Sequence, residues 1–226
     1  MILQPSYIPW RGYFHQIQKA DLFIFYDDVQ FDRHGWRNRN KIKTEQGSIW
    51  LTIPVLNKGK YGAHINQMLI SPTENWRKNH LASLRHSYSK APFFKDYFPV
   101  IESIFENQTD SLAEFTIEST IKLAGLLGVK RTKFEYSSNI PSKGRKTERL
   151  LEILKFVGAS HYISGPSAKN YLDEEKFQMA GITLEYINYN YPEYPQLYPP
   201  FEPQISILDL LFMTGENGHC YIWGEK

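Results

Sequence analysis

The sequence predicts an α/β fold, with a Rossmann-like, mostly parallel sheet that carries an antiparallel β insertion and a helical segment. Three observations indicate this class. Apolar runs alternate with helical patterns over residues 1–28 and again after residue 129, as expected of a parallel sheet. Short strand-like runs over residues 30–70 are separated by the turn sequences E-Q-G and N-K-G-K-Y-G. Residues 72–128 carry helix signals instead.

The first half begins with a strand, I-L-Q, that breaks at Gln4-Pro5 and passes through an aromatic turn into a helix from about Gly12. The next run, D-L-F-I-F-Y-D-D, is almost continuously apolar before its acidic end, which is typical of a strand buried on both faces. Within the insertion we expect strands near residues 36–43, 48–55 and 64–70.

Three helices are expected in the helical segment. The first starts with Ser71 as N-cap, Pro72 at the first helical position and Glu74 three residues after the cap, and runs to about Tyr88. A second covers residues 93–106. The third starts at Ser111, with Glu114 three residues on, and ends at Gly128.

The second half alternates strands at 130–136, 161–165 and 182–187 with helices at 147–157 and 173–180. Residues 186–203 are rich in Tyr and Pro, so they exclude regular structure and predict an ordered aromatic flap. A last helix is expected at 206–213.

Composition limits the classes of protein to which the chain can belong. The 226 residues predict one domain spanning 1–226, and 42% hydrophobic with 22% charged residues fits a globular chain. A net charge of +2 gives no reason to expect nucleic acid as a partner. No apolar stretch reaches 18 residues, so no membrane span is expected. The single Cys220 and the absence of a signal-peptide pattern predict a cytoplasmic location; the oligomeric state stays open.

The aromatic turn after the first strand supplies the first candidate site. Ligands of open α/β sheets bind beyond the carboxyl ends of the strands, which makes Gln4, Tyr7, Trp10, Gly12 and His15 candidates. The alternative is a stiff loop whose aromatic side chains simply cover it.

Two basic segments predict binding of phosphate. Arg37, Arg39, Lys41 and Lys43 alternate with other residues, among them Asn38, so a strand here places the four cations on one face. The alternative is an edge strand protected by charge.

The second segment, Lys143-Gly144-Arg145-Lys146, precedes a helix start, where an anion offsets the like charges and Thr147 serves as N-cap. Its alternative is a solvated loop.

Acids and histidines supply the catalytic candidates. Asp27 and Asp28 end the second strand, with Asp32 just after it; they hold Mg²⁺ or Asp28 acts as a general base. His15 and His80 are further candidates for proton transfer. The alternatives are aspartates bonded to their own turn and a core histidine at position 80.

Ser164 and Gly165 end a predicted parallel strand, and Ser167 and Lys169 follow. Small residues permit close approach of a ligand to backbone amides, so this loop is a candidate nucleotide or acyl-donor site. An ordinary strand-to-helix loop has the same composition.

The motifs Q-P-S-Y-I-P-W-R-G-Y-F, D-D-V-Q-F, W-R-N-R-N-K-I-K, W-L-T-I-P-V, Y-I-S-G-P-S-A-K-N-Y-L and S-I-L-D-L-L-F resemble the WbqC-like family over nearly the whole chain. The resemblance implies a role in bacterial O-antigen and other surface-polysaccharide assembly, where transfer of glycine or a similar aminoacyl group to a sugar has been proposed. The matching motif positions, which carry no secure catalytic assignment, are Gln4, Pro5, Tyr7, Pro9, Gly12, Asp28, Gln30, Asn38, Arg39, Asn40, Lys41, Ser164, Gly165 and Asp209.

The leading hypothesis is a transferase that acts on a sugar and uses a phosphorylated or nucleotide-linked ligand. A second hypothesis is a nucleotidylyltransferase or ATP-dependent ligase using Mg²⁺, because the first turn is similar to the P-x-x-G-H region of such enzymes. Tyr13 stands where their histidine follows glycine, and His15 lies two residues on. A third is a non-catalytic module that binds a glycan or a protein.

Overall fold

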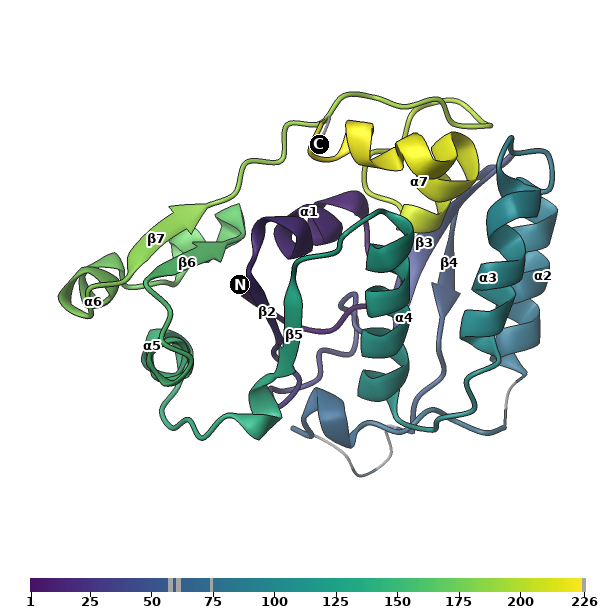
Figure 1. Cartoon of the computed structure of the whole chain (residues 1–226). Coiled ribbons are helices and arrows are strands. Elements are labelled where there is room, and N and C mark those ends of the chain that lie inside the picture. Colours follow the sequence, from purple (N-terminus) through teal and green to yellow (C-terminus); the bar gives the residue numbers. More distant parts are fainter. Residues whose placement is uncertain (57–58, 60–61, 74, 225–226) are drawn as a thin grey trace.

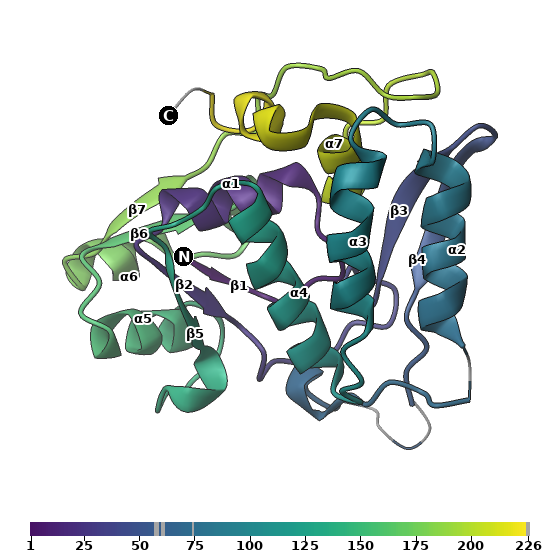
Figure 2. The same ribbon diagram turned by 45° about the vertical axis from the view of Figure 1, so that its right-hand side comes forward.

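A computed structural model describes residues 1–56, 59, 62–73 and 75–224 of the chain. Figures 1 and 2 show a central parallel sheet, a smaller strand pair on one side of it, and an antiparallel pair with its helices on the other. The predicted α/β class, with a parallel sheet and a small antiparallel one, is confirmed.

The parallel sheet has the order β1–β2–β5, formed by Ile2–Leu3, Leu22–Phe25 and Lys133–Tyr136. Helix α1 (Arg11–Lys19) connects β1 to β2. The apolar run of β2 is buried on both faces, as predicted. Phe23 and Phe25 pack in a core with residues of α1 and α4 (Leu112–Leu126). Ile24 packs in a second core with α5 (Lys146–Phe156).

A second parallel pair, β6 (His161–Ser164) and β7 (Thr183–Tyr186), lies beyond β1 rather than beyond β5 (Figure 1). Across the gap the five strands follow the order β5, β2, β1, β6, β7. This is the 3-2-1-4-5 order of a doubly wound sheet, whose switch point falls between β1 and β6. At that point the described strands do not pair. The short helices η3 (Pro166–Asn170) and α6 (Glu174–Met179) connect β6 to β7.

The antiparallel insertion is shorter than predicted. Strands β3 (Arg39–Thr44) and β4 (Gly47–Thr52) pair in register from Arg39↔Thr52 to Thr44↔Gly47. The third expected strand at 64–70 is instead the 3-10 turn η1 (Ile65–Gln67), flanked by isolated bridges. Of the expected turn at 57–62, only residues 59 and 62 are described.

Helices α2 (Trp76–Tyr88) and α3 (Phe94–Phe105) lie beside this pair, with α4 between them and the parallel sheet (Figure 2). The expected start of α2 at Ser71 is wrong, because the Ser71 hydroxyl closes a turn with Thr73 and the helix begins five residues later. Glu74 lies outside the described residues. The other predicted cap is confirmed: the Ser111 side chain accepts from the amide of Glu114 and starts α4.

The helix start at residues 143–147 also differs from expectation. Arg145 occupies the N-cap position of α5, without a side-chain cap. Thr147 lies within the helix, where its hydroxyl accepts a 3.1 Å bond from the amide of Asp173.

The C-terminal helix α7 (Ile207–Thr214) connects the insertion to the rest of the chain. Its buried Asp209 accepts a 3.0 Å bond from the hydroxyl of Tyr88, which in turn accepts a 2.9 Å bond from the amide of Lys43. Burial raises the pKa of Asp209 to about 6, although the hydrogen bonds and nearby Lys43 oppose the shift. The Tyr88 hydroxyl therefore joins α2, β3 and α7.

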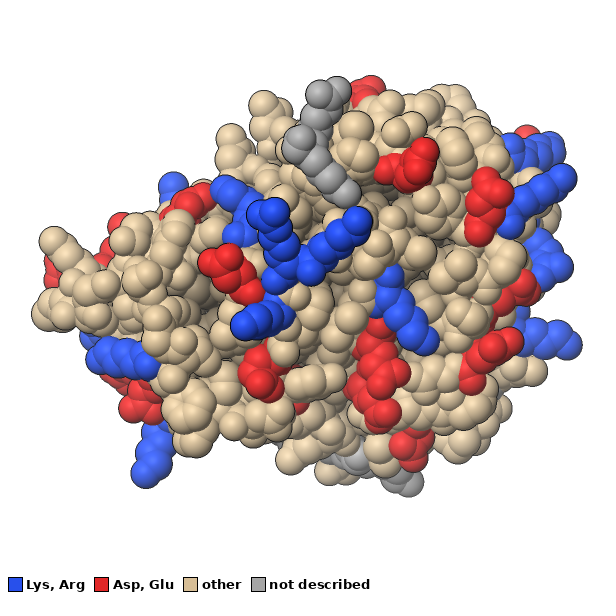
Figure 3. Space-filling view, viewed as in Figure 1, with Lys and Arg blue, Asp and Glu red and all other residues tan. Residues whose placement is uncertain are grey.

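Both signs of charge are present on the face in Figure 3, where Lys and Arg lie among Asp and Glu. Among the described residues, no helix combines the length and apolar character needed to cross a bilayer.

Replacing Tyr88 with Phe removes the shared hydroxyl and leaves both the Lys43 amide and Asp209 without that partner. We expect the free energy of unfolding to fall by about 1–3 kcal/mol, measured by urea denaturation at pH 7. Tyr97→Phe on α3 is the matched control, because the Tyr97 hydroxyl has no hydrogen-bond partner in the described part of the chain. Equal losses in the two variants would contradict the role given to Tyr88.

Candidate functional site

A cavity of about 810 Å³ lies at the split between β1 and β6. One wall comes from β1 and the aromatic turn after it, and the other from the end of β6 and η3. The backbone of β1 explains the first wall. The carbonyl of Leu3 accepts from the amide of Tyr26 on the β2 side. The N–H and C=O groups of the flanking residues Ile2 and Gln4 therefore point in the opposite direction, toward β6. The lining residues are Ile2, Leu3, Gln4, Ser6, Pro9, Trp10, Tyr13, Gln16, Tyr26, Val29, Trp36, Arg37, Lys146, Leu150, Tyr162, Ser164, Gly165, Pro166, Ser167, Ala168, Tyr171, Tyr189 and Gln204.

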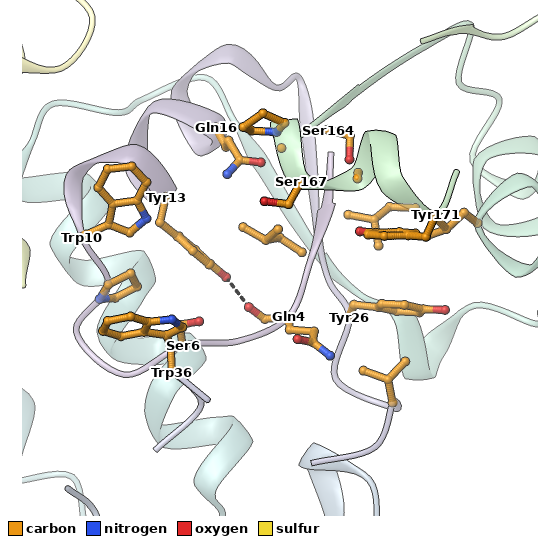
Figure 4. Close-up of a pocket in the computed structure, with 18 of the residues that line it drawn as sticks. Gln4, Ser6, Trp10, Tyr13, Gln16, Tyr26, Trp36, Ser164, Ser167 and Tyr171 are labelled. Carbon is orange, nitrogen blue, oxygen red and sulfur yellow. Dashed lines mark hydrogen bonds between the residues drawn. The ribbon is translucent and has the colours of Figure 1, made fainter. Parts of the chain in front are cut away.

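We call one end of the cavity the indole end, formed by Trp10, Tyr13 and Trp36 (Figure 4). Tyr13 reaches it from α1 and donates a 3.0 Å bond to the carbonyl of Gln4. The indole of Trp10 packs edge-on against Tyr189 of the Tyr- and Pro-rich segment, with ring centroids 5.0 Å apart. That segment is ordered, as predicted, but Tyr189 is its single contribution to the described lining.

At the opposite end, the tyrosine end, lie Tyr26 and Tyr171 (Figure 4). Tyr162 also lines the cavity and lies near both of them. Tyr26 directly follows β2, and Tyr171 follows η3. Tyr162 on β6 is held in place by stacking on Phe177, with ring planes 4° apart. Lys146 begins α5 at this end, one helical turn before Arg149, whose guanidinium lies over the Tyr26 ring.

Uncharged polar side chains lie between the two ends, among apolar residues such as Ile2 and Ala168. Gln4, Ser164 and Ser167 face the middle of the cavity (Figure 4). Gly165 packs closely against Tyr189, because a Cβ at position 165 would lie 3.3 Å from the Tyr189 hydroxyl. Amide and hydroxyl groups at this position donate and accept hydrogen bonds with sugar hydroxyls.

The charge of the lining is positive. Arg37 and Lys146 are its cations, and none of the described lining residues is a carboxylate, imidazole or thiol. Arg37 donates a 3.1 Å bond to the carbonyl of Pro5 and pairs with the exposed Asp32 at 3.3 Å. Burial lowers the pKa of Arg37, but arginine stays charged in proteins, so the cavity is suited to an anion.

The other three cations of the expected basic strand, Arg39, Lys41 and Lys43, do not line this cavity. Arg39 and Lys41 lie over Trp50 on the outer face of the antiparallel pair, at 4.3 and 5.4 Å from its ring centroid. Lys43 is buried and donates to the carbonyl of Pro200, so the four cations do not form one open stripe. The intervening Asn38 is buried and donates to the carbonyl of Ile53.

In the second basic segment only Lys146 lines the cavity. Lys143, Gly144 and Arg145 are exposed outside it, and the backbone amide of Lys143 donates to Glu152. The two basic segments therefore contribute one cation each, at opposite ends.

The paired aspartates serve the structure beside the cavity. Asp27 is buried and accepts from the hydroxyls of Ser137 and Ser138, at 3.0 and 2.7 Å. Asp28 forms an ion pair with Arg149 and also accepts from Ser137. Among the described residues no group of three acidic, His or Cys side chains is placed to hold a metal ion. The assignments of Asp27 and Asp28 to Mg²⁺, and of Asp28 as a general base, stay predictions. Neither aspartate is among the described residues that line the cavity.

Tyr7 and the two candidate histidines also lie outside the lining. Tyr7 is fully buried and hydrogen-bonds through its hydroxyl to Nδ1 of His80, at 2.8 Å. Burial lowers the pKa of His80 to about 4, so this histidine is neutral at pH 7. His15 pairs with the hydroxyl of Tyr191 at 2.9 Å, and burial lowers its pKa.

Sequence reasoning missed the aromatic residues of the tyrosine end. Tyr26 had a usable signal, because it follows directly after a buried parallel strand, where ligands bind. Tyr171 had none, since its position depends on where the β6 pair packs.

Comparison with known proteins identifies the family of the chain and a similar protein. The family model described as the WbqC-like protein family matches residues 4–220. The uncharacterized protein Rv1507c of Mycobacterium tuberculosis (strain ATCC 25618 / H37Rv) is 40% identical over 223 residues, which cover 98% of this chain and 96% of the relative. No solved structure gives a significant match.

Gly12 allows a test of the cavity wall, because a Cβ there would lie 2.4 Å from the Trp10 ring. Gly12→Ala displaces this indole, and we expect it to lower the free energy of unfolding by about 1–3 kcal/mol in urea denaturation. The matched control is Gly125→Ala in α4, where nothing lies within 4 Å of the added Cβ. The control should stabilise by up to about 1 kcal/mol, as Ala does in helices. The same sign of change in both variants would contradict the close packing of Trp10 on Gly12.

Proposed function

Because the chain belongs to the WbqC-like protein family, we propose that its cavity binds a phosphorylated or nucleotide-linked sugar for modification during bacterial surface-polysaccharide assembly. The reaction in this proposal is transfer of an acyl or aminoacyl group, such as glycine, to the sugar. The observation that carries it is the lining of the cavity: aromatic rings, uncharged amides and hydroxyls, and two cations.

Each part of the lining suits one part of such a ligand. The carbon-bound hydrogens of a sugar ring present apolar surface, which is removed from water by packing on Trp10 or Trp36. Sugar hydroxyls pair with groups such as the Gln4 amide and the Ser164 hydroxyl. Lys146 and Arg37 offset phosphate charge. An apolar pocket with a few polar groups that fix orientation is the usual form of a small-molecule site.

The lack of a carboxylate or imidazole in the described lining limits the chemistry of transfer. A sugar hydroxyl needs a base to accept its proton during attack, whereas a neutral amine attacks an acyl carbon directly and afterwards loses its proton to the departing group or to water. The lining therefore favours an amino sugar as acceptor, with cations that stabilise developing negative charge.

A second candidate function is a non-catalytic binding module, favoured by the same lack of acid and base groups in the described lining. Nucleotidyl transfer has less support, because Asp27 and Asp28 are engaged with Ser137, Ser138 and Arg149 outside the cavity.

Calorimetric titration with UDP-N-acetylglucosamine and glucose 1-phosphate tests the binding proposal. Lys146→Gln removes a lining cation, and we expect about tenfold weaker binding of both compounds, or about 1.4 kcal/mol. Lys143→Gln is the control, since it removes another exposed cation three residues away that does not line the cavity. Absence of binding to the unmodified protein, or equal weakening in both variants, would contradict the assignment.

Mass spectrometry separates the transferase from the binding module. The protein is incubated with UDP-glucosamine and either glycyl-tRNA or an acyl-coenzyme A. A mass increase of the sugar that requires the protein supports transfer, whereas binding with no change in mass for either donor supports the module.

A further inference from the structure

The tyrosine end of the cavity contains two aromatic rings that face each other across an open space. Tyr26 comes from the end of β2 and Tyr171 from the end of η3, so they stand on opposite sides of the split. In Figure 4 the two rings lie one above the other and roughly parallel. Tyr26 and Tyr171 both line the same cavity, and burial, with a smaller contribution from nearby Tyr171, raises the pKa of Tyr26.

Tyr26 is a fixed wall of this gap. The Arg149 guanidinium lies 5.1 Å from the centre of the Tyr26 ring, and Arg149 does not line the cavity, so it supports the ring from behind. Arg149 is itself held by its ion pair with Asp28 and by a 3.3 Å bond to the Asp28 carbonyl. Asp28 thus acts here as a positioning residue for the wall, through Arg149.

Tyr171 forms the opposite wall of the gap, and it is largely exposed. The residue is 58% exposed although it is a large aromatic side chain facing a cavity. Its backbone is anchored, because its amide donates a 3.1 Å bond to the carbonyl of Ala168. Covering the exposed apolar surface of this ring with a ligand removes that surface from water and stabilises the complex.

We propose that the gap between Tyr26 and Tyr171 is a stacking site for the nucleobase of a nucleoside diphosphate sugar. The inference rests on the proposed function and specifies its substrate class. A planar base between two aromatic rings buries both of its faces, and such stacking accepts any base because every base has a π-face. Lys146, at the same end, faces the diphosphate, while the sugar extends past Gln4 and Ser164 to the indole end.

The dimensions of the site agree with this ligand. A cavity of about 810 Å³ is at the upper end of the range for drug-sized ligands, as a base, a diphosphate and a sugar together require. Lys146 begins α5 one helical turn before Arg149, which lies over the Tyr26 ring, so one cation is near the tyrosines. Amides and hydroxyls lie between the two ends.

Calorimetric titration of Tyr171 variants tests the stacking site. The titrants with a base are UDP, GDP and ADP, and those without one are glucose 1-phosphate and inorganic diphosphate. We expect Tyr171→Ala to weaken the best nucleotide about five- to one-hundredfold and to leave the base-free compounds unchanged. Tyr171→Phe keeps the ring and should bind nucleotide like the unmodified protein. Phe156→Ala, which removes an aromatic residue 61% exposed on α5 away from the cavity, is the matched control.

The outcomes separate this inference from the proposed function. If nucleotides bind no more tightly than inorganic diphosphate, or if Tyr171→Ala binds them as well as the unmodified protein, the stacking site is wrong. Binding of glucose 1-phosphate in that case leaves the proposed function standing. If none of the five compounds binds to the unmodified protein, both fail.

Discussion

The unpaired outer edge of β1 is the constraint on which the rest of the molecule depends. The strand is only two residues long, Ile2–Leu3, and Pro5 prevents its continuation because proline has no amide hydrogen to donate. One edge pairs with β2, while the other faces β6 without pairing in the described structure. A continuous ladder of hydrogen bonds between β1 and β6 would bring the two strands to within about 5 Å and fill the cavity with backbone. The cavity therefore exists because the sheet is divided here.

Many polar residues of the sequence motifs maintain this division from outside the cavity. Asn40 donates to the carbonyls of Tyr7 and Ile8, at 3.1 and 2.8 Å, and so holds the turn in which Ile8 has φ of +35°. Asp27 ties the end of β2 to the residues after β5 through Ser137 and Ser138. Buried polar groups need partners, and the partners of Asn40 belong to the turn that lines the cavity. The motif residues are therefore largely supports, and the surfaces offered to a ligand are mostly aromatic.

Some elements could be predicted from the sequence, and others could not. Ser111 with Glu114 predicted the start of α4 because a cap and its amide lie three residues apart, and this interaction is local. The same reasoning failed at Ser71, whose hydroxyl bonds Thr73 instead. In the basic strand, alternation correctly separated Arg39 and Lys41 from buried Asn38 and Asn40, but Lys43 is covered by the C-terminal segment near Pro200. Non-local contacts of this kind have no sequence period.

The amino-acid sequence by itself determined the α/β class, the order of most elements, the ordered aromatic segment and several members of the cavity, among them Gln4, Ser164 and Gly165. These follow from hydrophobic period, turn chemistry and the rule that ligands bind beyond strand ends, all of which act over a few residues. Only the tertiary structure decided that Tyr26 and Tyr171 face each other, that Asp28 is held by Arg149, and that Arg37 and Lys146 are the cations of the site. The reason is physical: each of these pairs joins segments about 110 to 145 residues apart, so their approach depends on tertiary packing that no local sequence pattern encodes.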